Sequence, residues 1–311
     1  MPRHSVPDTA TLPQPSPCNH SRPSPTDSPV ASETALDVRR QIRESLGLPS
    51  RPEAQPTVPV EGHVCDFPLW SYSKKRSRKT ELRVDYEDGS FLMLDASKGM
   101  PSPRFPGYLD AILFYGQRDL FLQDHTTLSV YSIFQTLGMN AGDGRNYAHF
   151  HRDMNRVFRM VLVTDRFRNP ATGQRSHVDH FRVMRRMKLA KSRREVSLFW
   201  FDDLFIASLR SGYLKRLDWD FCLWLDQQTE ALARFFYGHL VKRIGEKGAY
   251  TRNFLGFLRD CGLGYIASMA PKRRTEQLHE TVFPALELVK GKAIRGYERD
   301  DRGNIIFFPP D

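Results

Sequence analysis

The sequence contains an internal repeat, and this repeat limits the folds that are open to the chain. The stretch SIFQTLGM, residues 132–139, aligns with GFLRDCGL, residues 256–263, and places Gly262 124 residues after Gly138. Around each stretch the same elements are expected in the same order: a helix, a glycine that ends it, a second helix and a β-hairpin. With 311 residues, the chain is long enough for two compact units and a tail. We therefore predict an α+β protein that contains two copies of one unit.

The first unit, residues 63–212, is predicted to contain three helices followed by a long hairpin, which is the order of elements in a winged helix. The helices are expected at 108–116, at 128–138 with Thr126 and Thr127 as its cap, and within 144–162. The hairpin strands are expected at 160–167 and 178–184, joined by the turn sequence RNPATGQRS, with VSLFWF continuing the β character. A separate hairpin is expected earlier, where LRVDY and SFLML flank the turn at Gly89.

The second unit, residues 213–311, is predicted to repeat this order. Its helices are expected at 231–245 with Gly245 as the stop, at 251–263 and at 270–291, and its hairpin strands at 292–298 and 304–310. Pro284 falls inside the third helix and should kink or divide it. Between the units, Asp202 and Asp203 should cap a helix, and Trp219, Phe221 and Trp224 are expected in the core.

The first 62 residues differ from the rest in composition, since they hold more than half of the prolines and the dense stretch PQPSPCNHSRPSPTDSP. Such a segment cannot bury enough apolar area to offset its ordering entropy, so a disordered Pro-rich tail is predicted. A short helix is expected at 34–47, where apolar residues share one face and arginines lie elsewhere. It is either a fraying surface helix or a helix that docks on a partner.

Residues 144–162 are predicted to form a helix with an apolar side and a cationic side. At about 100° per residue, the apolar side gathers Tyr147, Phe150, Met154, Val157 and Val161. The other side gathers Arg145, His149, Arg152, Arg156 and Arg159. A cationic helix after a glycine-terminated helix suits the DNA major groove, because arginine can bind guanine or neutralise phosphates. The alternative is a basic face that is merely solvated.

The pair His149 and His151 raises a second interpretation, since two histidines around one apolar residue bind metal in rolling-circle nicking enzymes. On a strand the two side chains would share a face, whereas on a helix they lie about 200° apart and cannot grip one ion. The helical periodicity of the segment favours the helix. Tyr213 is the candidate nucleophile of the nicking alternative. For His177 to His180, a polar strand edge is favoured over a metal cluster.

Further cations are candidates for DNA contact outside this helix. The matching helix of the second unit begins with a basic cluster followed by polar groups, Lys272, Arg273, Arg274, Thr275 and Gln277. The predicted hairpins carry Arg166, Arg168 and Arg175 in the first unit and Arg299 and Arg302 in the second. The basic run before the first hairpin adds Lys74, Lys75 and Arg76, which either contact phosphate or form a solvated face.

The composition excludes several classes of protein. A formal charge of +10 and an isoelectric point near 9.5 favour polyanions, either nucleic acid or an acidic membrane surface. No apolar run approaches the roughly 20 residues of a membrane span, and no secretory segment is seen, so a cytoplasmic protein is expected. Cys18, Cys65, Cys222 and Cys261 lack metal or disulfide spacing and are expected to be free thiols. No cofactor, metal or enzymatic activity is expected.

The sequence resembles plasmid replication initiators of the replication initiator protein A family. The resemblance rests on FPLWSYSKKRSRK before a hairpin, a first winged helix, the bridge FDDLFIASLRSGYLKRLD and a second unit that ends in a basic helix and a short hairpin. It covers roughly Phe67 to the C-terminus and depends on order and hydrophobic pattern. The long Pro-rich tail and Pro284 depart from the family's simplest pattern.

The resemblance implies a bacterial, non-enzymatic protein whose tandem winged helices bind repeated double-stranded sites in a plasmid origin. Bound copies would help to open an adjacent AT-rich region and recruit the host initiator and replicative helicase, and related initiators dimerise and repress their own promoters. In this sequence, 145–159 would form the first reading helix and 272–277 the second. A transcriptional repressor built from the same parts is the alternative within the binding class.

Overall fold

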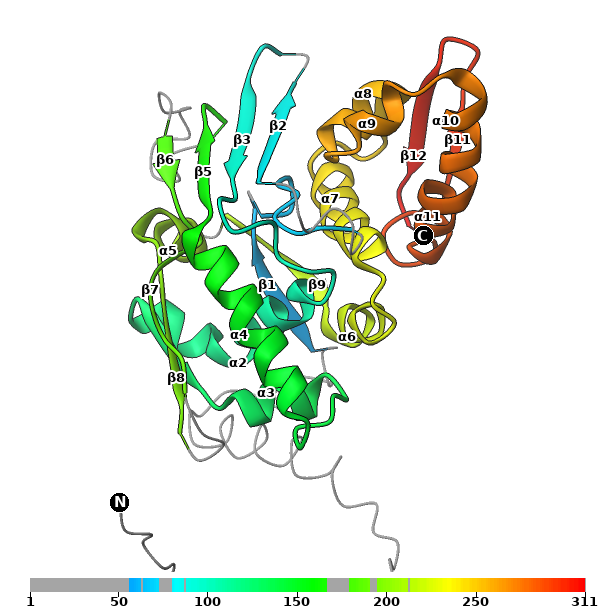
Figure 1. Ribbon diagram of the computed structural model, residues 1–311. Coiled ribbons are helices and arrows are strands. Elements are labelled where there is room, and N and C mark those ends of the chain that lie inside the picture. Colours follow the sequence, from blue (N-terminus) through cyan, green and yellow to red (C-terminus); the bar gives the residue numbers. More distant parts are fainter. Residues whose placement is uncertain are drawn as a thin grey trace, which may run out of the picture. The chain divides into compact units, whose positions relative to one another are not determined.

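The computed structural model describes residues 56–62, 64–72, 80–86, 88–166, 179–190, 195–211 and 213–310 (Figure 1). The chain divides into two compact units, 1–54 and 55–311, and all described residues belong to the second. The predictions of a disordered tail and of a helix at 34–47 therefore lie outside the described residues, except at 56–62.

The described part is a mixed α and β fold of helices and four small antiparallel sheets. The strands are β1 Thr57–Glu61, β2 Glu81–Asp85, β3 Phe91–Asp95, β4 His125–Leu128, β5 Val161–Thr164, β6 Asp179–Phe181, β7 Met184–Lys188, β8 Ser197–Phe201, β9 Leu214–Asp218, β10 Tyr250–Asn253, β11 Gly296–Arg299 and β12 Asn304–Phe308. The helices are α2 Phe105–Leu122, α3 Val130–Thr136, α4 Gly144–Arg159, α5 Asp203–Arg210, α6 Trp219–Gln227, α7 Ala231–Lys247, α8 Phe254–Asp260, α9 Gly264–Ala267, α10 Pro271–Gln277, the π-helical turn η2 Leu278–Val282 and α11 Phe283–Leu288.

The internal repeat predicted from the sequence is present as a repeated topology. In the first copy, α2, β4, α3 and α4 are followed by β7 and β8, and the sheet order is β4-β8-β7. In the second copy, α7, β10, α8 and the α10 to α11 segment are followed by β11 and β12, and the sheet order is β10-β12-β11. We call these the first repeat, residues 105–201, and the second repeat, residues 231–308.

The matched glycines end matched helices in the same way. Gly138 has φ +66° and Gly262 has φ +68°, and each follows the last turn of its helix, α3 or α8. In α3, Gly138 N donates to Gln135 O (3.1 Å) and Met139 N to Phe134 O (2.8 Å). In α8, Gly262 N donates to Arg259 O (2.8 Å) and Leu263 N to Leu258 O (2.7 Å). These pairs are Schellman bonds, which use the left-handed conformation that glycine adopts without strain.

The repeats contact each other through matched positions. Asp110 in α2 and Arg234 in α7 stand 124 residues apart, the spacing of the two glycines. They form a buried bidentate ion pair, in which Arg234 Nε donates to Asp110 Oδ2 (2.6 Å) and Nη2 donates to Oδ1 (2.8 Å). The strands β1 and β9, which both lie outside the repeats, pair antiparallel, with Pro59 opposite Arg216. A single buried hydrophobic cluster includes side chains of both repeats, such as Phe134 and Phe257. The two repeats therefore share one core.

Four boundaries differ from the sequence predictions, and strand pairing with distant partners explains three of them. Thr126 lies in β4, opposite Phe199 of β8, and α3 begins after Ser129. Residues 251–253 likewise belong to β10, paired with β12, before α8 begins. The helix expected to stop at Gly245 continues to Lys247, and Gly248 (φ +74°) follows it. The strand β1 lies in the segment predicted as tail, where partners distant in sequence bury it.

Other elements match the predictions. The early hairpin is present as β2 and β3, which pair antiparallel. Asp202 caps α5 by accepting a hydrogen bond from Leu204 N (3.0 Å). Pro284 follows the π-helical turn η2, which divides the predicted long helix into α10 and α11. Of the three residues expected in the core between the units, Trp219 is buried and Phe221 is half-buried, whereas the prediction is wrong for Trp224, which is 42% exposed.

Candidate nucleic-acid interface

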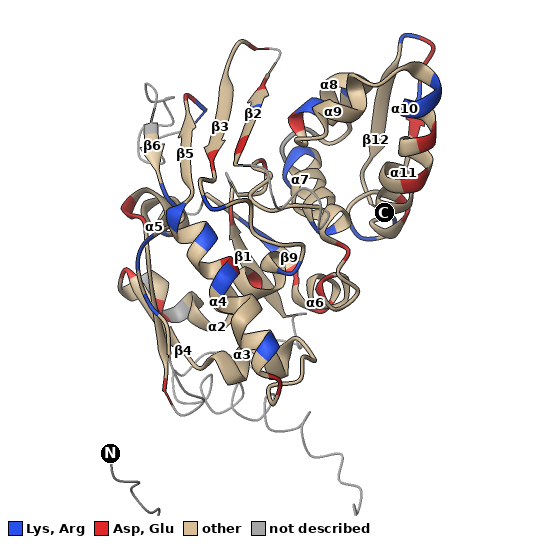
Figure 2. Cartoon of the chain, viewed as in Figure 1, with Lys and Arg blue, Asp and Glu red and all other residues tan. Residues whose placement is uncertain are grey.

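The helix α4 confirms the helical prediction for residues 144–159. Asp143 begins it, since its Oδ1 accepts a hydrogen bond from Arg145 N (2.8 Å), and the helix ends at Arg159. Cationic residues appear along its visible length in Figure 2. Val161, which the periodicity placed on this helix, is instead the first residue of β5.

The apolar side of α4 packs into the core as predicted. Phe150, Met154 and Val157 have no exposed surface, and Phe150 meets Tyr108 of α2 edge to face at 5.1 Å between ring centroids. Asp153 is also fully buried, and its Oδ1 accepts from Ser102 N at 3.0 Å. This anchoring fixes the rotation of α4, so the opposite face must point away from the core.

The outward face of α4 carries exposed Arg145, His149, Arg152 and Arg159. Arg156 is different, because its side chain is only 19% exposed. It lies 3.6 Å from Asp153 Oδ1, and its Nε donates to Lys98 O at 3.2 Å. Arg156 thus stabilises the fold around α4 and has less freedom to reach a ligand than its neighbours on the stripe.

The two histidines of α4 point in different directions, as expected for a helix. His149 is exposed and contacts Arg152, while His151 is half-buried toward Ala190, and its burial lowers the pKa of the imidazole. The metal-pair interpretation requires a strand at this position, and the helix therefore contradicts it. Among the described residues, no group of three or more His, Cys, Asp or Glu side chains could hold a metal ion. Tyr213, the candidate nucleophile, packs its ring against Gly62.

The second repeat presents a helix with the same alternation of burial. The segment α10, η2 and α11 matches α4 at a spacing of 128 residues, so that Leu278, Val282 and Ala285 are buried where Phe150, Met154 and Val157 are buried. Lys272 and Arg273 are exposed in its first turn. Arg274 Nη1 donates to Ala267 O (3.2 Å), and Thr275 Oγ1 donates to Pro271 O (3.1 Å). Gln277 Nε2 donates to Glu280 Oε2 (2.7 Å), so three of the five predicted contacts are engaged within the protein.

The charges on the two matched helices differ. Figure 2 shows cationic residues at the start of α10 and acidic residues along the remainder of α10 and α11. The acidic residues are Glu276, Glu280 and Glu287, all exposed. The exposed charge of the second helix is therefore positive at its first turn and negative farther along, a distribution that attracts a polyanion only at the first turn.

The prediction that β5 and β6 form the wing of the first repeat is wrong. The strands β5 and β6 pair as expected, but they belong to the sheet β2-β3-β5-β6, outside the repeated topology. Arg166, predicted to reach DNA, stacks on the Tyr86 ring at 3.7 Å and donates to Ser90 Oγ at 3.0 Å, so it holds the β2–β3 hairpin. In the second repeat, Arg299 and Arg302 are exposed, and the Arg299 guanidinium lies 4.7 Å from the Phe254 ring.

The hairpin that matches β11 and β12 is β7 and β8, which sequence reasoning did not single out. On its described strands the exposed cations are Arg185, Arg186, stacked on Trp200 at 4.7 Å, and Lys188. Arg185 instead pairs with Asp203, 2.6 Å away, and with Asp124. The sequence feature that could have identified this hairpin is the charged stretch MRRMK between two β-like segments. The predicted contacts Lys74, Lys75, Arg76, Arg168 and Arg175 lie outside the described residues.

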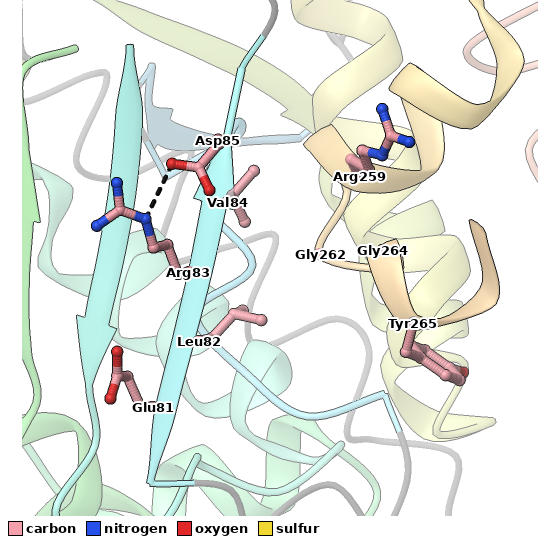
Figure 3. A pocket seen from close by; sticks show the side chains of 9 residues that line it. All are labelled: Glu81, Leu82, Arg83, Val84, Asp85, Arg259, Gly262, Gly264 and Tyr265. Atoms are coloured by element: carbon pink, nitrogen blue, oxygen red, sulfur yellow. Dashed lines mark hydrogen bonds and ion pairs between the residues drawn. The ribbon is translucent and has the colours of Figure 1, made fainter. Parts of the chain in front are cut away.

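The surface of the described fold has several hollows, two of which have volumes of several hundred Å³. One, of about 320 Å³, separates β2 from the α8 to α9 turn (Figure 3). There Arg83 is turned to Asp85, with Nε–Oδ1 of 2.9 Å, and Arg259 lies on the opposite wall. The second, of about 510 Å³, lies beside the α3 to α4 turn and is lined by Arg104, Asn146 and Asp226 among others. Among the described residues, neither hollow gathers more than two cations.

Two further predictions concern the cysteines, expected to be free thiols, and the helices, none of which was expected to span a membrane. Cys65, Cys222 and Cys261 are free and buried, as expected, and burial raises the pKa of Cys65 to about 12. Cys18 lies outside the described residues. In the part of the chain that the structure describes, no helix is long and apolar enough to cross a membrane.

Comparisons with known proteins find similar structures but no similar sequence. No protein-family model and no curated protein matches the sequence. A crystal structure of a selenomethionine derivative of domains 2 and 3 of RctB is 12% identical, with a TM-score of 0.48 over 79% of this chain and 99% of that chain. Another crystal structure of RctB domains 2–3 is 11% identical, with a TM-score of 0.43 over 76% and 94%. At this identity the likeness concerns the fold alone.

Proposed function

We propose that this protein binds double-stranded DNA and that α4 enters the major groove. The observation that carries the proposal is the outward face of α4, where Arg145, His149, Arg152 and Arg159 are exposed opposite a fully buried face. An α-helix fits the major groove, and arginine on it can bind guanine O6 and N7 or neutralise phosphates. A net charge of +10 adds attraction to any polyanion.

The repeated topology supports a tandem winged helix. In each repeat a first helix is followed by a strand, a second helix that ends at a glycine, a third helix and a two-stranded hairpin. In this proposal the third helices, α4 and the α10 to α11 segment, read successive major grooves of one site, and the hairpins contact the adjacent backbone. The protein then acts by binding and deforming DNA, without catalysis.

The finer proposal is a plasmid replication initiator that acts in the bacterial cytoplasm. Its support is the sequence resemblance to the replication initiator protein A family together with the duplicated topology. Several copies on repeated sites would strain the duplex and recruit the host initiator and helicase. Bending a site of this size costs on the order of 1 to 6 kcal/mol, which many phosphate contacts can offset.

Duplex binding tests the proposal directly. We expect the full chain to bind duplex DNA in fluorescence anisotropy, with affinity falling steeply as salt rises. Arg145→Ala combined with Arg152→Ala should weaken specific binding by about 1 to 3 kcal/mol for each arginine that reads a base. The control is Arg83→Ala combined with Arg216→Ala, two exposed arginines outside α4 that remove the same charge. Equal losses in both double variants would remove α4 from the proposal.

A plasmid maintenance assay separates an initiator from a repressor. The gene and its flanking DNA are cloned into a vector that cannot replicate in the host. Autonomous replication that fails in the Arg145→Ala and Arg152→Ala double variant supports the initiator. Binding to an operator with no replication would make the protein a repressor. Metal-dependent nicking of the flanking DNA, lost in Tyr213→Phe, would overturn the non-enzymatic proposal.

A further inference from the structure

The matched burial of the two third helices identifies which outward positions correspond. Leu278, Val282 and Ala285 take the buried places of Phe150, Met154 and Val157, each 128 residues later. The same spacing assigns Arg273 to Arg145, Gln277 to His149 and Glu280 to Arg152. The residues Arg273, Gln277 and Glu280 therefore form the outward face of the second helix, and we call them the second reading face.

This face differs from that of α4 in one respect that matters for recognition. Where α4 presents Arg152, the second helix presents the exposed carboxylate of Glu280. A carboxylate beside the DNA backbone is repelled by phosphates and gains nothing from counterion release. If it enters the groove, it must be compensated by a hydrogen-bond donor on a base edge.

The geometry around Glu280 holds it in a defined position. Gln277 Nε2 donates to Glu280 Oε2 at 2.7 Å, which fixes both side chains on the same face of the helix. Glu280 lies within the π-helical turn η2, and Phe283 N closes that turn on Leu278 O. Such turns are rare and often occur at functional sites. The pairing leaves the second carboxylate oxygen, Oε1, able to accept another hydrogen bond.

Base chemistry selects the group that this oxygen fits. In the major groove, guanine presents only acceptors, whereas cytosine presents its N4 amino donor, which glutamate accepts. A carboxylate is repelled by the acceptors of guanine and by the O4 of thymine. Adenine also has a donor, N6, but the N7 acceptor beside it repels a carboxylate, and cytosine has no such neighbour. Glutamine beside it can bind the N6 and N7 of adenine.

We propose that Glu280 is a specificity-determining residue that accepts a hydrogen bond from the amino group of a cytosine, while Gln277 reads the neighbouring base. This inference rests on the proposed duplex binding. Glu280 selects a base by excluding the others, and it opposes binding to every site that lacks the donor. Its removal should therefore affect affinity in the opposite direction to the removal of an arginine.

Selection of sites from a random duplex library, with wild type and Glu280→Gln side by side, tests the inference. We expect the wild type to require cytosine at one position and the variant to lose this preference by on the order of tenfold or more. Binding of the variant to duplexes without the selected site should become stronger. Gln277→Ala should weaken the base preference only at the neighbouring position of the DNA site.

The control is Glu81→Gln, which removes an exposed carboxylate from β2, outside the repeated topology, and should leave base preference unchanged. Thermal unfolding of each variant checks that the fold is retained. If the wild type binds duplex DNA but Glu280→Gln selects the same sites with the same stringency, the inference fails and the proposed function stands. If the wild type binds no duplex DNA at all, both fail.

Discussion

At the scale of single residues, the contact between Asp110 and Arg234 shows how the repeats are joined. Both side chains are about 3% exposed, and their double hydrogen bond links α2 of the first repeat to α7 of the second. Each would be costly to bury alone, because an unpaired charge in the interior loses its hydration. The pair therefore makes the position of each repeat depend on the other.

Breaking this pair should be strongly destabilising. Arg234→Ala leaves Asp110 buried without its partner, and we expect the free energy of unfolding to fall by about 3 to 5 kcal/mol in urea titrations. Replacing both partners by apolar residues, Asp110→Leu with Arg234→Met, should cost far less than the single change. A double variant as unstable as the single one would show that the charge itself is needed.

A buried histidine predicts an acid sensitivity. Burial lowers the pKa of His239 below its usual 6.5, and the ring lies 3.2 Å from Asp66 with Arg243 also near Asp66. Above pH 6.5 the ring is neutral in both states, so it adds no pH dependence. As the pH falls below 6.5, the unfolded chain binds the proton first, and the free energy of unfolding decreases. Urea titrations at pH 7 and 5.5 should show a smaller loss in His239→Gln.

At the scale of elements, the two glycine stops are alike in backbone but not in surroundings. A Cβ at Gly262 would lie 2.9 Å from Cγ of Pro68, whereas at Gly138 the nearest atom is the flexible Gln227 Nε2 at 3.3 Å. Both positions have positive φ, where a side chain costs roughly 1 to 2 kcal/mol. The stop of α8 therefore also fixes how closely the segment at Pro68 packs.

Alanine at these two positions should separate backbone strain from packing. We expect both Gly138→Ala and Gly262→Ala to lower the free energy of unfolding, and Gly262→Ala to lower it more, because the Pro68 ring must move. Equilibrium unfolding by urea measures the difference. Equal losses would mean that the Pro68 contact relaxes without cost.

The β7–β8 hairpin should contribute to DNA affinity through phosphates. Arg186→Ala with Lys188→Ala should reduce the slope of log affinity against log salt by about 0.9 for each phosphate that is no longer neutralised, without changing the preferred site. Arg83→Ala, on β2 outside the repeated topology, serves as the control. An unchanged slope would exclude these two side chains from the interface.

At the scale of the whole molecule, β1 ties the start of the described chain to the centre of the fold. Val58 and Val60 are 0% and 3% exposed, and the strand pairs with β9, which leads into the second repeat. Burying each valine contributes about 1.5 to 3 kcal/mol. Part of this gain is offset by the entropy of ordering the strand, but the remainder still matters against the roughly 5 to 15 kcal/mol typical of a domain.

Truncation tests this arrangement. A fragment of residues 55–311 should unfold at the same urea concentration as the full chain. A fragment that begins at Val64 lacks β1 and should be less stable by about 3 kcal/mol or more, the value of the two valines. Equal stability of the two fragments would show that β1 adds nothing to the shared core.

The sequence alone determined the features that depend on local periodicity and on glycine. The burial of Phe150, Met154 and Val157 follows from their spacing on a helix, and the stops at Gly138 and Gly262 follow from the freedom of glycine at positive φ. The duplication was visible because both signals recur in the same order. The exposed stripe of α4 was predicted on the same basis.

The tertiary structure alone decided the features that depend on partners distant in sequence. Thr126 reads as a helix cap but is a strand residue because β8 lies beside it, and the first-repeat hairpin is β7–β8 because β8 pairs with β4. The engagement of Arg156 with Asp153 and the ion pair of Asp110 with Arg234 are likewise invisible in any local pattern. Periodicity fixes which face of an element is buried, whereas pairing across the fold fixes what that face meets.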